Sequence, residues 1–312
     1  MAVTDVLVTG GCGFLGNPVV AGLLARGANV TILDDLSSGR APIPNPRLQF
    51  IKGDIADARL VNEVVSSVPF THVVHLAALH YIPKCDREPK LAFMTNVAGT
   101  RNVAQACVGL TALKSFVFAS TMAVYTPSSE VLDENALAVP IDVYGWSKLV
   151  SEDLVRGACL EGNFGGVVLR LSNLIGPGET NPHLFPELAK QIMSGADRIE
   201  VGNLTPKRNY VHTHDVAERV LACLEQDWNG VEVINIGSEE EYSVSEVLTK
   251  FQRQAPHAFE FVATQERQRQ VDRPRLQPNI QKMRRLLGSP SRTVDDAIQA
   301  IFAEENPSFL AA

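Results

Sequence analysis

Apolar and polar residues follow two alternating patterns over the first 170 positions of the chain. Short apolar runs, typical of buried strands, alternate with stretches of helical apolar spacing. The expected strands are residues 3–9, 29–33, 48–52, 72–77, 115–119 and 166–171, and the expected helices are residues 14–26, 60–67, 90–110 and 144–160. Strands that alternate with helices pair in parallel, so the pattern predicts an α/β fold with a doubly wound parallel sheet.

The pattern changes after residue 173. Turn formers appear at Gly176-Pro177-Gly178 and Asn181-Pro182, and shorter elements follow. Helices are expected at residues 215–225, 243–254 and 279–287. We therefore expect residues 1–173 to form the nucleotide-binding domain and residues 174–312 to form mainly a smaller C-terminal substrate-binding lobe. Within the second part, a segment at about 208–237 is expected to return to the main sheet.

Composition and charge narrow the class of protein. The net charge of −7 and a pI near 5.6 argue against a nucleic-acid partner, which a basic patch would serve. No apolar run reaches the ~20 residues that span a bilayer, and the N-terminus lacks the features of a signal peptide. The five cysteines are scattered without metal-ligand spacing. We expect a cytoplasmic protein with reduced thiols, no membrane contact and no metal.

The first expected strand leads into a glycine-rich turn. Gly10, Gly13 and Gly16 lie between that strand and the following helix, with Phe14 and Leu15 before the last glycine. In this setting Gly10 permits the tight turn, Gly13 lets the backbone approach a pyrophosphate, and Gly16 lets the helix lie close to the sheet. The free N–H groups of the helix N-terminus then face the anion. The sequence therefore predicts a dinucleotide site on a Rossmann-type sheet.

Two carboxylates are expected to contact the adenosine half of the dinucleotide. Asp34 ends the second strand, where a carboxylate accepts the ribose hydroxyls and repels a 2′-phosphate. This favours NAD over NADP, although the nearby Arg40 weakens the preference. Asp54 follows the third strand and is expected to face the adenine, with an ordinary exposed loop acid as the alternative.

A tyrosine and a lysine lie one helical turn apart at Tyr144 and Lys148. On a helix both fall on one face, where the ammonium is expected to stabilise the phenolate and lower its pKa. The tyrosine can then exchange a proton with a substrate hydroxyl or carbonyl. Some 20 residues upstream, Ser120 and Thr121 end a strand, at the sheet edge where ligands bind.

These motifs occur together and in a fixed order. They are Thr-Gly-x-x-Gly-x-x-Gly at 9–16, Asp-Asp-Leu-Ser-Ser-Gly at 34–39, Gly-Asp at 53–54, His-Leu-Ala-Ala at 75–78, Asn-x-x-Gly-Thr at 96–100, Ser-Thr-x-x-Val-Tyr at 120–125, Tyr-x-x-x-Lys at 144–148 and Arg-x-x-Asn-x-x-Gly-Pro at 170–177. With these motifs in this order, the chain resembles the NAD-dependent sugar epimerase/dehydratase family of extended short-chain dehydrogenases/reductases. The resemblance runs from about residue 3 to residue 290.

The resemblance implies a role for individual residues. Thr121 holds the reacting sugar oxygen, with Ser120 as the weaker candidate; Tyr144 is the acid/base; Lys148 contacts the nicotinamide ribose. The implied NAD site comprises Gly10, Gly13, Phe14, Leu15, Gly16, Asp34, Asp35, Ser38, Gly39, Asp54, Ile55, Leu76, Ala77, Ala78, Asn96, Tyr144 and Lys148. The implied site for the nucleotide-diphosphate sugar, with UDP as the expected nucleotide, comprises Thr121, Asn173, His183, Leu184, Arg208, Arg269 and Asp272. For His183, an ordinary surface histidine is the alternative.

The chain departs from the family pattern at several positions. Met122-Ala123 stands where the family's 4,6-dehydratases carry an acidic pair, which disfavours dehydration. Cys85 replaces a usual serine, Leu171-Ser172 a usual aromatic pair, and Gln270-Val271 a Pro-Gly pair. The resemblance therefore implies a 4-epimerase, with a 4-ketoreductase, decarboxylase or dehydratase on a similar substrate as the alternative. A non-catalytic NAD(P) sensor is disfavoured by the complete Thr121, Tyr144 and Lys148 set. The resemblance also implies a homodimer through the helices at 90–110 and 144–160.

Overall fold

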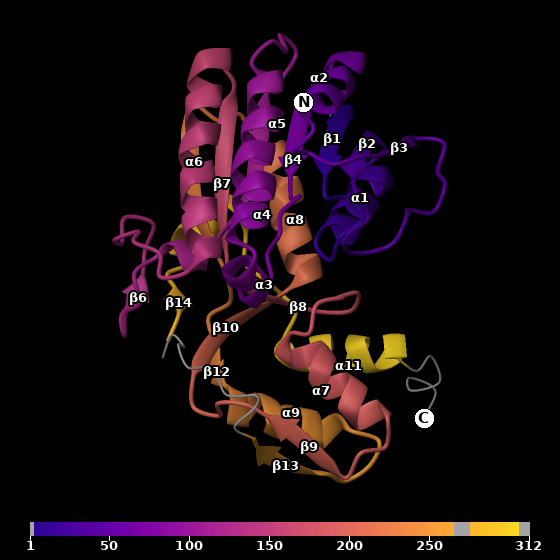
Figure 1. Cartoon of the computed structure of the whole chain (residues 1–312), viewed down its shortest axis with the longest axis vertical. Coiled ribbons are helices and arrows are strands. Elements are labelled where there is room, and N and C mark those ends of the chain that lie inside the picture. The colour runs from indigo at the N-terminus through magenta and orange to yellow at the C-terminus, as the bar shows by residue number, and fades with distance from the viewer. Residues whose placement is uncertain (1–2, 265–274, 306–312) are drawn as a thin grey trace.

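The computed structural model describes residues 3–264 and 275–305. Its main feature is a seven-stranded sheet in the order β11-β7-β5-β4-β1-β2-β3, with all neighbours parallel (Figure 1). The strands are β1 (Asp5–Thr9), β2 (Asn29–Asp34), β3 (Leu48–Lys52), β4 (His72–His75), β5 (Ser115–Thr121), β7 (Gly165–Leu171) and β11 (Val231–Ile236). The predicted fold class, a doubly wound parallel sheet, is confirmed.

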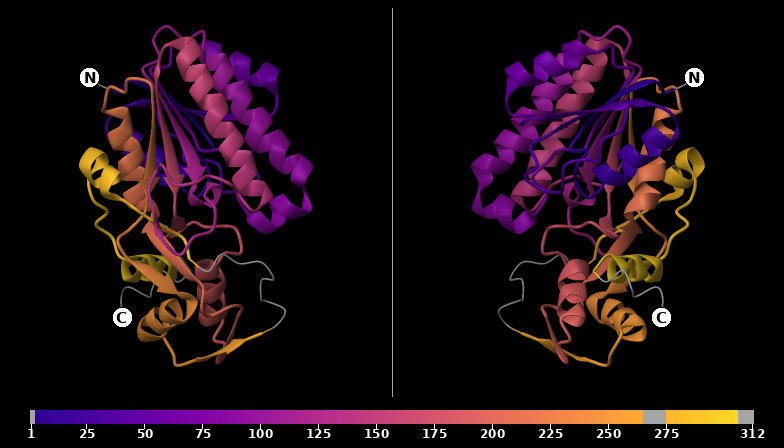
Figure 2. Two further views of the ribbon diagram at one scale, coloured as in Figure 1. Left: turned by 90° about the vertical axis from the view of Figure 1, so that its left-hand side faces the viewer. Right: turned by 90° about the vertical axis from the view of Figure 1, so that its right-hand side faces the viewer.

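Helices cover both faces of this sheet, and Figure 2 shows the three layers edge-on. One face carries α2 (Ala58–Ser67), α5 (Thr100–Cys107) and α6 (Val143–Gly162), packed over Phe116 and Phe118. The other face carries α1 (Gly16–Ala25), α8 (Thr213–Leu224) and α10 (Gln281–Leu287). Because both faces of the sheet are covered, strands such as β5 are buried along their whole length, and the apolar run at their centre made them recognisable in the sequence.

The segment expected to be one helix at 90–110 is divided in the structure. It contains α4 (Pro89–Phe93), a π-helical stretch (Met94–Gly99) and α5, and a short helix α3 (Ile82–Arg87) precedes it. The expectation of one regular helix is wrong because apolar spacing does not distinguish α-helical from π-helical hydrogen bonding. Such π segments occur frequently at functional sites.

The C-terminal lobe has its own core, built around Phe185, Phe251 and Phe302. Its helices are α7 (Leu184–Met193), α9 (Val244–Gln254) and α11 (Val294–Glu305). Its strands are β8 (Asn173–Ile175), β10 (Lys207–His212) and β12 (Glu241–Ser243) in one sheet, and the pair β9 (Arg198–Val201) and β13 (Glu260–Ala263). A further pair, β6 (Val131–Leu132) and β14 (Gln277–Pro278), lies beside the sheet end.

The segment at about 208–237 is shared between the two parts. Strand β10 belongs to the small sheet, whereas α8 packs on α1 and β11 forms the edge of the main sheet beside β7. Within the described residues, none of the helices is both long enough and apolar enough to cross a membrane.

Candidate active site

A large cleft of about 1480 Å³ runs along the carboxyl ends of the main strands and reaches into the C-terminal lobe. Ligands of open parallel sheets bind at this edge, where the strand order reverses. The reversal lies between β1 and β4, which are neighbours in the sheet. Residues from the glycine-rich turn, the end of β5, α6, β8 and α7 all line the cleft.

The glycine-rich turn has the shape of a phosphate cradle. Gly10 has a φ of 72°, and a Cβ there would lie 2.6 Å from the backbone nitrogen of Ala77. At Gly16 a Cβ would lie 2.2 Å from the Gly10 carbonyl oxygen, so only glycine allows α1 to begin this close to the turn. No side chain caps the start of α1. Its N-terminal N–H groups are therefore suited to a pyrophosphate.

Asp34 lies beside this turn and lines the cleft. Its Oδ2 accepts a hydrogen bond from the Cys12 N–H at 3.0 Å, and its Oδ1 accepts one from the Leu36 N–H at 2.8 Å. Burial raises the pKa of Asp34 above its ordinary value, while these two hydrogen bonds lower it. The carboxylate is thus held in a fixed orientation at the end of β2, as a ribose-binding group requires.

Most of the other expected cofactor residues line the same cleft. These are Gly13, Phe14, Leu15, Asp35, Ser38, Asp54, Ile55, Leu76, Ala77 and Ala78. Gly39 lies behind the cleft surface, where its left-handed backbone packs against the Cys12 carbonyl. Together with the cradle and Asp34, this lining fits a dinucleotide.

Asn96 also lies behind the cleft surface, buried in the π-helical segment. Its Nδ2 donates to the Leu79 carbonyl and to Ser147 Oγ, both at 2.9 Å, and its Oδ1 accepts from the Leu79 N–H at 2.7 Å. The Asn96 side chain therefore fixes the loop after β4 to α6. This support explains its place in the motif better than direct lining of the cleft does.

Tyr144 lies in the first turn of α6 and faces the cleft. Asp142 caps the helix by accepting a hydrogen bond from the Gly145 N–H at 2.7 Å. A Cβ at Gly145 would lie 2.5 Å from the Ala123 carbonyl oxygen, so glycine lets the helix approach the end of β5. This approach brings Tyr144 and Thr121 together, with Thr121 near enough to lower the pKa of the Tyr144 hydroxyl.

Burial dominates the protonation of the tyrosine and lysine. It raises the pKa of Tyr144 above its ordinary value, partly offset by the hydrogen bond with Thr121. It also lowers the pKa of Lys148 to about 7, against the opposing charge of Glu152. The expected net lowering of the Tyr144 pKa is therefore absent, because desolvation of the phenolate outweighs any help from Lys148. The Lys148 Nζ lies 4.2 Å from the centroid of the Phe118 ring.

Ser120 and Thr121 have different surroundings. Ser120 also borders the cleft, but it is only 1% exposed and its hydroxyl donates a hydrogen bond to Glu152, which forms an ion pair with Arg170. Thr121 lines the cleft and accepts from the Ala123 N–H at 3.1 Å. This difference favours Thr121 as the group that meets a substrate. Met122 and Ala123, which follow it, give this part of the cleft an apolar lining.

The expected substrate residues occupy the C-terminal side of the cleft. Asn173, His183, Leu184 and Arg208 all line it. The Asn173 Nδ2 donates to the Asn209 carbonyl at 3.1 Å, which joins β8 to β10. Arg269 and Asp272 lie outside the described residues.

Among the cleft residues that were not predicted from the sequence are His80, Glu179 and Asn181. They come from two loops that are about 100 residues apart in the chain, so no local spacing links them. The only signal was the cluster of turn formers at 176–182, which indicated a loop without indicating its neighbours.

Comparison with known proteins agrees with this geometry. The profile of the NAD-dependent epimerase/dehydratase family matches residues 6–237. The chain is 30% identical over 303 residues to a UDP-glucose 4-epimerase of Lacticaseibacillus casei, with 91% of this chain and 90% of the relative covered. It is 28% identical over 308 residues to a UDP-N-acetyl-alpha-D-glucosaminuronate decarboxylase of Bacillus cytotoxicus, with 90% of each chain covered.

Solved structures give the same result over the whole fold. The UDP-glucose 4-epimerase of Thermus thermophilus, in complex with NAD, superposes with a TM-score of 0.87 at 28% identity. That alignment covers 99% of this chain and 100% of the epimerase. Because the family profile spans most of the chain and the relative at 30% identity covers 91% of it, the chain belongs to the NAD-dependent epimerase/dehydratase family.

Proposed function

We propose that the protein is an NAD-dependent nucleotide-sugar 4-epimerase. The observation that carries this proposal is the placement of Thr121 and Tyr144 together at the cleft surface, where Thr121 lowers the Tyr144 pKa, with Lys148 one helical turn away on the same side of α6. A sugar hydroxyl placed between these groups meets one residue that holds its oxygen and one that takes its proton.

The chain's own residues supply the proton transfers. Thr121 donates a hydrogen bond to the sugar O4 and orients it, and Tyr144 removes the proton from the 4-hydroxyl. Lys148 binds the nicotinamide ribose and supplies the positive charge that a buried phenolate needs. NAD held in the cradle would supply the acceptor for the C4 hydride and its donor on return. After the 4-keto sugar has turned over in the cleft, the hydride would reach the opposite face of C4 and Tyr144 returns the proton to O4.

The cleft lining favours epimerisation over the related reactions. Dehydration across C5 and C6 needs an acid and a base near the reacting sugar, whereas Met122 and Ala123 give none at the position after Thr121. A non-catalytic NAD sensor has no need for Tyr144, which here is half-buried, lies in the helix turn capped by Asp142 and faces the cleft beside Thr121. A decarboxylase is the second candidate, because one of the relatives carries that name.

The C-terminal wall of the cleft is the proposed binding site for the substrate. We propose a UDP-sugar, because the epimerases above are named for UDP-glucose. Asn173 and Arg208 are the proposed diphosphate contacts in the described part of the wall. Arginine suits this task because its planar group binds phosphate oxygens in pairs. The proposal also places the enzyme in the cytoplasm as a homodimer.

Cofactor stoichiometry and product analysis test the proposal together. An epimerase regenerates NAD within each cycle, so the purified enzyme should retain about one NAD per chain and turn over without added cofactor. A panel of UDP-sugars, including UDP-uronic acids, followed by NMR should show one pair of C4 epimers interconverting. Net consumption of NADH would indicate a ketoreductase, and release of CO₂ a decarboxylase.

A further inference from the structure

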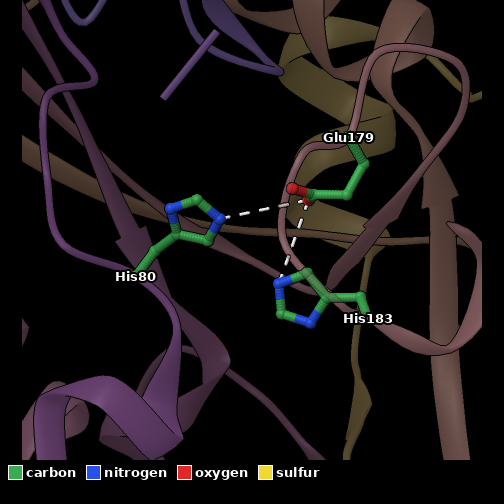
Figure 3. Close-up of side chains that lie close together, drawn as sticks. All are labelled: His80, Glu179 and His183. Carbon is green, nitrogen blue, oxygen red and sulfur yellow. Dashed lines mark ion pairs between the residues drawn. The ribbon is translucent and has the colours of Figure 1, made fainter. Parts of the chain in front are cut away.

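Three side chains with metal-ligating atoms meet in the cleft (Figure 3). His80 comes from the loop after β4, and Glu179 and His183 come from the loop between β8 and α7. The Glu179 Oε2 lies 3.9 Å from Nε2 of His80 and 3.9 Å from Nε2 of His183. In the part of the chain that the structure describes, these three ligand atoms lie within 4.8 Å of one another. The proposed proton transfers use none of them.

The Glu179 carboxylate is oriented by its neighbours. Its Oε1 accepts hydrogen bonds from the Asn181 backbone N–H at 2.8 Å and from the Asn181 Nδ2 at 3.2 Å. The other oxygen, Oε2, is thereby directed at the two histidines. The Glu179 side chain is only 7% exposed, and a carboxylate this buried needs a cationic partner to offset its desolvation.

His80 presents the nitrogen that a metal ion requires. The Asn181 Nδ2 lies 3.1 Å from its Nε2, and because an amide nitrogen can only donate, Nε2 is the acceptor and the ring proton lies on Nδ1. The Nε2 lone pair therefore points into the cluster. A metal-bound histidine typically has this arrangement, with one nitrogen on the ion and the proton on the other.

Asn181 is compatible with a bound ion. Its Nδ2 lies 3.1 Å from His80 Nε2 and donates to that lone pair, and the same amide group donates to Glu179 Oε1. An amide has two N–H groups, so the bond to Glu179 survives when a cation takes the His80 lone pair. Asn181 would then hold the carboxylate ligand in place from behind.

We propose that His80, Glu179 and His183 bind one divalent transition-metal ion of the zinc class in the cleft. Two imidazoles and one carboxylate are a known ligand set for zinc sites that keep an open position. Zinc bonds of about 2.0–2.2 Å place tetrahedral ligand atoms roughly 3.4 Å apart. Each histidine nitrogen, 3.9 Å from Glu179 Oε2, must therefore approach that oxygen by about half an ångström, and the two histidine nitrogens, which lie within 4.8 Å, must approach each other by at most about 1.4 Å.

The ion would connect the two parts of the molecule. His80 belongs to the nucleotide-binding domain, whereas Glu179 and His183 lead into the C-terminal lobe. All three line the cleft, so the fourth coordination position opens onto it and is filled by water or by an oxygen of a bound molecule. From the sequence we expect no metal site. The three ligands could not be recognised there, because they come together only in the folded chain.

The test uses the full-length protein after treatment with a chelator. Calorimetric titration with ZnCl₂ should show one ion per chain, and Co²⁺ should give the visible absorption bands of a tetrahedral nitrogen and oxygen site. Removing an outer-shell partner of a metal typically weakens binding about 10–100-fold, so Asn181→Ala should fall in that range. His80→Ala, His183→Ala and Glu179→Gln remove a ligand and should weaken binding by at least about 100-fold.

Control variants separate this site from other sources of metal affinity. His257→Ala, at a half-buried histidine in the C-terminal lobe, should bind zinc as the wild type does. Tyr144→Phe should also bind zinc normally, so failure of the proposed epimerase reaction leaves this result unaffected. Retained NAD binding in each variant shows that it has folded. The proposal is overturned if the wild type binds no zinc stoichiometrically, if Glu179→Gln binds it equally well, or if the Co²⁺ spectrum shows thiolate ligands.

Discussion

Glu152 and Arg170 form a buried ion pair next to the carboxyl end of β5, the strand that ends with Ser120 and Thr121. The Arg170 Nη2 lies 2.7 Å from Glu152 Oε2, the Arg170 Nε lies 3.0 Å from Oε1, and the side chains are 7% and 2% exposed. Glu152 also accepts the Ser120 hydroxyl, and it lies one turn beyond Lys148 on α6. The pair thus joins α6 to β5 and β7, and it fixes the helix that carries Tyr144.

Removing one partner of this pair should be strongly destabilising. Glu152→Gln leaves Arg170 as an uncompensated buried charge, which typically costs about 3–5 kcal/mol. We expect that loss in the free energy of unfolding measured by urea denaturation. Glu63→Gln is the matched control, because its pair with Arg59 is exposed and such pairs contribute little to stability. Equal losses in the two variants would contradict a structural role for Glu152.

Asp34 should set the preference for NAD. Asp34→Asn keeps the size of the side chain and removes the charge that repels a 2′-phosphate and accepts ribose hydroxyls. Hydrogen bonds to charged groups contribute about 1.5–3 kcal/mol, so NAD should bind about 10–100-fold more weakly while NADP binds better relative to it. Calorimetry with both cofactors checks this, and unchanged affinity for UDP is the control. Tighter binding of NADP than NAD by the wild type would refute this role of Asp34.

Stability should fall as the pH decreases below about 6.5. Burial lowers the pKa of His75 to about 3 and that of His72 to about 4, whereas histidines in the unfolded chain titrate near 6.5. Between these values the unfolded chain binds more protons, so acid favours unfolding, with a slope of at most about 1.4 kcal/mol per pH unit for each histidine. Above pH 6.5 both states are neutral, and this contribution to stability is fully present.

His75→Gln isolates one part of this pH dependence. The His75 Nε2 lies 2.9 Å from Thr100 Oγ1, and glutamine keeps a polar group there without a titrating proton. Urea unfolding at pH 7.5 and at pH 5 should therefore show a smaller loss of stability in the variant. An identical loss in both proteins would mean that His75 does not titrate as the buried site indicates.

Exposed apolar side chains mark the surface through which the proposed homodimer would form. Trp146, Val150 and Leu160 fall on one face of α6 and are exposed, as are Leu91 and Met94 on the neighbouring segment. Light scattering at micromolar concentration should give the mass of a dimer, since two-fold pairing is the commonest closed assembly. Val150→Glu should shift the protein to monomer, whereas Leu137→Glu, at a more exposed position in the loop before α6, should not. A monomeric wild type would contradict the proposal.

The main sheet could be predicted because its strands are buried on both faces and alternate with amphipathic helices. The cradle at Gly10–Gly16 and the Tyr144–Lys148 pair were also predictable, since each depends on a local spacing. The C-terminal lobe was less predictable because its short strands, such as β8 and β9, lack long apolar runs. The cluster of His80 and Glu179 could not be predicted, because it depends on how two distant loops fold against each other.

The protonation of Tyr144 shows a second limit of sequence reasoning. Spacing alone suggested that Lys148 lowers the pKa of Tyr144, whereas the structure raises it through burial. A sequence reveals which charges are near in the chain, but not how much water the fold removes from them. The positive charge that offsets the desolvation of the Tyr144 phenolate must come from the folded site.

The central claim is that Tyr144 carries the proton in a C4 epimerisation. The most direct test compares wild type, Tyr144→Phe and Thr121→Val on the UDP-sugar that the wild type interconverts, with products followed by NMR. Tyr144→Phe removes only the hydroxyl, so folding and NAD binding should persist while turnover falls by about 10²–10⁴-fold. Thr121→Val should cost less, because it removes one hydrogen bond and keeps the proton carrier. Near-wild-type turnover by Tyr144→Phe would contradict the mechanism and leave only the NAD-binding fold.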